Sequence, residues 1–165
     1  MNIIELLLTE LESEAQTTRK FLAIVPFDKA EWAPHEKSMK VMPLSTHIAE
    51  LPGWISLGLT SDELDFATAP YTPIVVNNNK DLLAVFEKNY EEAKAELKKA
   101  NEEELAKRWV LRNGEQILSD MNKYGIIRIA FSQTTHHRAQ LGVYFRLLGI
   151  PVPSSYGPTA DDQSF

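Results

Sequence analysis

The chain has 165 residues, and 17 Lys and Arg against 23 Asp and Glu give it a formal net charge of -6. Hydrophobic residues make up 44% of the chain, and it contains no cysteine. The length predicts a single domain over residues 1–165, because domains are most often roughly 100–150 residues long. The lack of cysteine excludes disulfides, thiolate nucleophiles and Cys-ligated metal clusters.

The acidic balance argues against nucleic acid as a partner, since binding a phosphate backbone requires a basic face. The N-terminal stretch MNIIELLLTELESEAQ lacks the basic start of a signal peptide. No apolar run approaches the ~18 residues of a membrane-spanning helix. We therefore expect a cytoplasmic protein that binds neither nucleic acid nor membrane.

Hydrophobic periodicity predicts four amphipathic helices. Apolar residues recur at intervals of three and four over residues 2–24, 43–59, 80–103 and 120–148. In the first helix, Ile3 and Leu6 are expected on the buried stripe. Pro52 predicts a kink or break in the second helix, because proline removes a backbone hydrogen bond. Asp120 is expected to cap the start of the last helix.

Two connections differ from ordinary short loops. Residues 60–79 form a long segment with two prolines, which suits a crossing loop. In the stretch WVLRNGEQIL, residues 109–118, Asn113 and Gly114 lie between short apolar runs, which is typical of a β-hairpin with a type I′ turn. The whole pattern predicts an all-α fold, a four-helix bundle with a small β-hairpin before the last helix.

Two of the four histidines, His47 and His137, fall on the apolar stripes of different predicted helices. Imidazoles that project from facing helices into a bundle can bind a metal. Burying such a ring without a partner costs about 1–3 kcal/mol, so each inward histidine needs a ligand or a hydrogen bond. The alternative is a core histidine bonded to a backbone carbonyl or to water.

Two further polar residues lie near these histidines in the sequence. Gln133 is four residues before His137 and shares its helix face. Glu50 is three residues after His47 and is a candidate catalytic base. The alternatives for Glu50 are a solvated side chain or a structural partner for Arg128 or Arg138.

Several motifs resemble those of DinB-like proteins. The element HHRAQ at 136–140, its continuation VYFRLLGIPVP and the YGP near the C-terminus resemble the C-terminal half of that superfamily. The stretch WVLRNGEQ is similar to its hairpin, and MPLSTHIAELPGW, residues 42–54, is similar to its second-helix motif. The resemblance covers nearly the whole chain and is weakest over 60–105. It implies an up-down-down-up four-helix bundle, often paired as a homodimer.

The resemblance also implies a divalent metal, commonly nickel, zinc or iron, held by three histidines. Carried over by position, two of them fall on His47 and His137, whereas the third position is occupied by Gln133. An amide oxygen is a poorer ligand than imidazole for zinc or nickel, so weaker metal binding is expected. Gln133 either binds the metal or hydrogen-bonds His137 and orients it.

Three functions fit this reasoning. The first is a metal-dependent transferase or hydrolase that uses a low-molecular-weight thiol or water on an unknown substrate, by analogy with thiol-dependent enzymes of the superfamily. The second is a non-catalytic small-molecule-binding or stress-response dimer whose metal site is degraded by Gln133. The third is a structural dimer in which the inward histidines are satisfied core residues.

Overall fold

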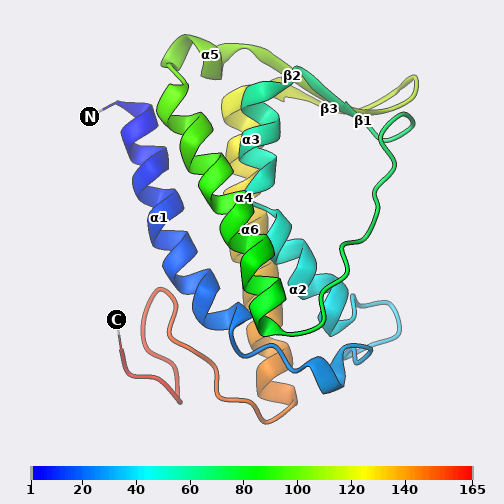
Figure 1. Ribbon diagram of the computed structural model, residues 1–165, viewed down its shortest axis with the longest axis vertical. Coiled ribbons are helices and arrows are strands. Elements are labelled where there is room, and N and C mark those ends of the chain that lie inside the picture. The colour runs from blue at the N-terminus through cyan, green and yellow to red at the C-terminus, as the bar shows by residue number, and fades with distance from the viewer. Residues whose placement is uncertain (1, 165) are drawn as a thin grey trace.

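The computed structural model describes residues 2–164, which form a mainly helical fold with a small three-stranded sheet. The helices are α1 (Ile3–Leu22), η1 (Phe27–Lys29), α2 (Val41–Glu50), α3 (Gly53–Thr60), α4 (Asn79–Lys99), α5 (Glu102–Ala106) and α6 (Lys123–Leu147). Figure 1 shows α1 and α6 running down the view, and α2, α3 and α4 running up it. Over residues 2–164, no helix is both long and apolar enough to cross a membrane.

The helices pack through apolar stripes, and one core joins residues from all the long helices. α4 and α6 each lie against α1, α2 and α3. The buried stripe of α1 runs through Ile4, Leu7 and Leu11, whereas Ile3 and Leu6 are 40% and 50% exposed. The prediction for those two residues was wrong, because each lies about 100° around the helix from its buried neighbour.

Pro52 breaks the helix predicted over 43–59 into α2 and α3. Its ring nitrogen has no hydrogen to donate, so the regular ladder of backbone hydrogen bonds cannot continue. Gly53 follows at the start of α3, where α4 comes very close. A Cβ atom at this position would lie 2.5 Å from Asn89 Oδ1. The helix is thus divided at Pro52, and the glycine that follows allows α3 to lie close to α4.

The last helix begins later than the sequence pattern predicts. Asn122, and not Asp120, caps α6, because its Oδ1 accepts a hydrogen bond of 2.8 Å from the backbone N–H of Gly125. Asp120 instead lies in a strand and accepts two hydrogen bonds from Arg108 across the hairpin. The predicted third helix also ends early, at Lys99, and the short helix α5 follows it.

The hairpin before α6 is part of a larger sheet than expected. It consists of β2 (Arg108–Asn113) and β3 (Gln116–Asn122), and β1 (Glu63–Asp65) pairs in parallel with β2. Asn113 pairs with Gln116, so the turn is centred on Gly114 and Glu115. Gly114 has a φ of 60°. Within residues 2–164, only glycines have a positive φ. The hairpin is therefore present, but its turn lies one residue further along than predicted and is not of type I′, because Glu115 does not have a positive φ.

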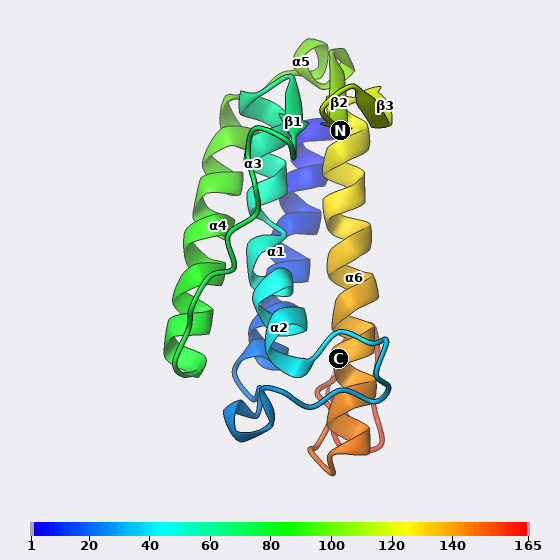
Figure 2. The same ribbon diagram turned by 90° about the vertical axis from the view of Figure 1, so that its right-hand side faces the viewer.

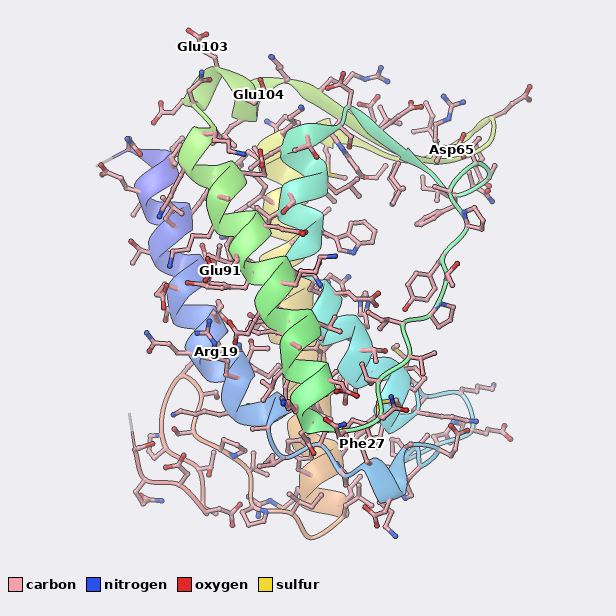
Figure 3. The ribbon with its side chains drawn as sticks, viewed as in Figure 1. Arg19, Phe27, Asp65, Glu91, Glu103 and Glu104 are labelled. Carbon is pink, nitrogen blue, oxygen red and sulfur yellow. The ribbon has the colours of Figure 1, made fainter. Side chains whose placement is uncertain are left out.

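The segment 66–78 links β1 to α4 without helix or strand. Figure 1 shows this segment descending apart from the helices, and in Figure 2 it passes in front of α3. Figure 3 labels Asp65 at the point where the chain leaves the sheet. The segment therefore covers the side of the molecule where α2 and α3 meet α4.

Candidate functional site

His47 and His137 come together in the folded chain. His47 lies in the last turn of α2 and His137 lies in the middle of α6. Their ring centroids are 4.7 Å apart, and the ring planes are inclined at 79°. Both side chains are partly buried. Imidazoles from two separate helices thus lie next to each other at the edge of the core.

The orientation of His137 is set by Gln140, one turn further along α6. His137 Nδ1 and Gln140 Oε1 are 2.8 Å apart. An amide oxygen can only accept a hydrogen bond, so the proton lies on Nδ1 and the lone pair lies on Nε2. Sequence reasoning overlooked Gln140, although its spacing of three from His137 is that of facing side chains on a helix. A histidine metal ligand commonly donates its second N–H in this way.

Burial favours the neutral form of both imidazoles. It lowers the pKa of His47, and the proximity of His137 lowers it further. Burial also lowers the pKa of His137, against the opposing effect of the Gln140 hydrogen bond. The nearby His136, whose ring centroid is 4.9 Å from that of His137, lowers the pKa of His137 as well. Neutral imidazole is the form that can bind a metal ion.

The three positions expected to bind a metal hold two histidines and one glutamine, so one imidazole is missing. Zn–N bonds are about 2.0–2.1 Å long, so rings as close as those of His47 and His137 can share one ion. Within residues 2–164, no group of three His, Asp or Glu side chains is arranged to hold a metal. Gln133 lies one turn before His137 on α6 and is partly buried. Of the three expected ligands, His47 and His137 are thus the two whose rings the structure brings together.

A cleft of about 610 Å³ opens beside His47. It lies between α2, α3, α4 and the segment 66–78, which supply its walls. Its polar lining residues are His47, Glu50, Tyr71, Lys88 and Asn89. Its apolar lining includes Trp54, Leu57, Leu64, Phe66, Ile74 and Val85. Small-molecule sites commonly have this size and this mixture of apolar walls with a few polar groups.

Glu50 faces this cleft and does not pair with an arginine. Its Oε2 accepts a hydrogen bond of 2.9 Å from the hydroxyl of Tyr71, which reaches it from the segment 66–78. Burial raises the pKa of Glu50, and the Tyr71 hydrogen bond partly offsets that effect. Burial and the bond to Glu50 raise the pKa of Tyr71 to about 12. Nothing in the sequence pattern pointed to Tyr71, because residues 60–79 have no periodicity.

The two arginines considered as partners of Glu50 pair with other residues. Arg128 binds Glu10, and Arg138 binds Glu14, so both connect α6 to α1. The alternative in which Glu50 is a structural partner of Arg128 or Arg138 is therefore wrong.

Comparison with known proteins places the chain in a family. The model of the DinB family matches residues 1–164. The chain belongs to the DinB family. The predicted resemblance to the DinB-like superfamily is thereby confirmed. No curated protein matches this DinB-family chain.

Solved structures agree with this assignment. A DinB-like protein from Bacillus subtilis is 18% identical, with a TM-score of 0.69 over 96% of this chain and 99% of that one. A DinB-like protein from Bacillus cereus is also 18% identical, with a TM-score of 0.69 over 93% of this chain and 97% of that one. At this level of identity the likeness shows the fold alone.

Proposed function

We propose that this DinB-family protein binds a divalent metal ion through His47 and His137, with Gln133 as a weaker third ligand, and acts on a small molecule in the adjacent cleft. The observation that supports this proposal is the pairing of two neutral imidazoles, 4.7 Å apart, next to a cleft of about 610 Å³. The reaction class is transfer or hydrolysis, with a low-molecular-weight thiol or water as the nucleophile.

Each residue around His47 and His137 has a separate role in this proposal. A divalent ion, when bound, supplies Lewis-acid chemistry and lowers the pKa of a thiol or water. Gln140 holds His137 so that Nε2 is available as a ligand. Glu50 is the candidate base, and its raised pKa makes it a better proton acceptor than an ordinary carboxylate. The Tyr71 hydroxyl donates to Oε2 of Glu50, which leaves Oε1 as the oxygen that accepts a proton.

Metal titration tests the proposal most directly. Protein purified without a nickel column should bind Ni²⁺ or Zn²⁺ at one ion per chain in calorimetry, and His47→Ala or His137→Ala should abolish that binding. His35→Ala is the matched control, because His35 lies in an exposed loop. Gln133→His should tighten the dissociation constant about tenfold or more, since imidazole is the better ligand for these metals. Absence of metal uptake by the unaltered chain would overturn the proposal.

A second candidate is a small-molecule-binding protein without catalysis. Gln133 at the third ligand position favours it, together with the incomplete donor set. In that case the unaltered chain binds no metal, whereas Gln133→His creates a tight site. The titration above separates the two functions.

We also propose an up-down-down-up four-helix bundle that pairs as a homodimer. The helix directions in Figure 1 support the bundle order. The exposed apolar side chains of α6 support the dimer, because Ile129, Val143 and Leu147 fall on one side of the helix and are 38%, 57% and 60% exposed.

A further inference from the structure

The cleft beside His47 contains one carboxylate that lacks a cationic partner. Glu50 is partly buried and its hydrogen-bond partner is the neutral hydroxyl of Tyr71. Within the part of the chain that the structure describes, Glu50 forms no ion pair. A carboxylate withdrawn from water favours a nearby positive charge, because its own hydration is incomplete.

Lys88 lines the cleft but does not pair with Glu50. Lys88 stands on α4 with its side chain 75% exposed, and its ammonium nitrogen is 4.0 Å from Glu92. It therefore lies at the mouth of the cleft and is directed toward its own helix. Of the described residues that line the cleft, Glu50 is the one with a carboxylate, and no positive side chain among them pairs with it.

Three aromatic side chains line the same cleft. Trp54 on α3, and Phe66 and Tyr71 on the segment after β1, all line the cleft together with Glu50. The electron-rich faces of such rings attract ammonium groups, and cages of aromatic residues are a common site for quaternary ammonium ligands. Leucine, isoleucine and valine residues form the rest of the wall and suit an apolar body.

We propose that this cleft binds an organic cation, namely an amine or quaternary ammonium group attached to an apolar or aromatic body. The carboxylate of Glu50 and the rings of Trp54, Phe66 and Tyr71 contact the ammonium group. The ligand takes the position of the Tyr71 hydroxyl at Glu50. This proposal deepens the proposed function, on whose small-molecule role for the cleft it rests, by naming the class of molecule.

Calorimetry with three probes of similar size tests the charge preference. Benzyltrimethylammonium should bind the chain at least about tenfold more tightly than benzyl alcohol, and benzenesulfonate should bind least. Glu50→Gln should remove most of the preference for the ammonium probe and leave benzyl alcohol binding unchanged. The matched control is Glu91→Gln, because Glu91 is exposed on α4 and Figure 3 labels it on the α1 side of that helix, away from the segment 66–78.

A second pair of variants keeps the test decisive if Glu50→Gln does not fold. Trp54→Leu keeps the apolar volume but removes a ring, and should weaken the ammonium probe severalfold. Tyr71→Phe keeps the ring and frees Glu50, and should bind the ammonium probe at least as tightly as the unaltered chain. Equal affinity for benzyl alcohol and the ammonium probe, or a full ammonium preference in folded Glu50→Gln, would overturn the inference.

The same titrations, run with EDTA and then with Zn²⁺, separate this inference from the metal proposal. The ammonium preference should be present in both conditions, because none of the residues that create it is a proposed metal ligand. Loss of zinc binding with a retained ammonium preference refutes the metal site and supports the cation site. Zinc binding without an ammonium preference refutes the cation site alone.

Discussion

Arg138 follows His137 directly on α6 and is one of the largest fully buried side chains of the protein. Its guanidinium group is 2.7 Å from the carboxylate of Glu14 on α1. It also donates to the hydroxyls of Thr18 and Tyr156, and Tyr156 belongs to the C-terminal tail. Arg138 therefore holds α6 against α1 and the tail at the level of the histidine pair.

Arg138→Met should lower the free energy of unfolding by about 3–5 kcal/mol, because it leaves the mostly buried carboxylate of Glu14 without its cationic partner. Urea denaturation measures the change. Arg108→Met is the matched control: Arg108 pairs with Asp120 on the surface, and such pairs contribute about 0–1 kcal/mol. Equal losses of unfolding free energy in the two variants would show that the buried pair of Arg138 and Glu14 stabilises the protein no more than a surface pair.

Helix α3 lies close against α6 because Gly58 has no side chain. A Cβ atom at this position would be 2.6 Å from Cγ2 of Ile126 on α6. That methyl group is attached directly to the branched Cβ of Ile126 and cannot swing away without a change of rotamer. The contact helps to place α3, and with it the Trp54 wall of the cleft.

Gly58→Ala should therefore destabilise the protein by about 1–3 kcal/mol, although alanine is the better helix former. Thermal unfolding followed by circular dichroism measures this loss. Gly157→Ala serves as the control, because a Cβ atom at Gly157 would meet nothing within 4 Å. A more stable Gly58→Ala variant would mean that the helices separate readily at this point.

Pairing of two chains is the prediction for the molecule as a whole. Leu147→Glu places a charge among the exposed apolar side chains of α6 and should convert the proposed homodimer to a monomer, since an unpaired charge in an apolar interface is strongly unfavourable. Light scattering after gel filtration gives the mass. Val75→Glu is the control, because Val75 is 83% exposed on the segment 66–78. A monomeric unaltered chain would refute the dimer.

Local patterns in the sequence predicted most of the helical framework. Three- and four-residue spacing located the helices, and Pro52 located the break between α2 and α3. Such features depend on neighbouring residues alone, so they can be inferred without knowledge of the fold. Helix starts were less predictable, because Asp120 and Asn122 are both good caps and the extent of β3 decides between them.

By itself, the sequence determined that His47 and His137 lie on the inner stripes of two helices, and its motifs determined the family. Tertiary structure alone decided that β1 pairs with β2, that Tyr71 reaches Glu50, and that a cleft lies between the helices and the segment 66–78. The physical reason is that these contacts join residues far apart in the chain. Their formation depends on how whole elements pack, which no local spacing of residues records.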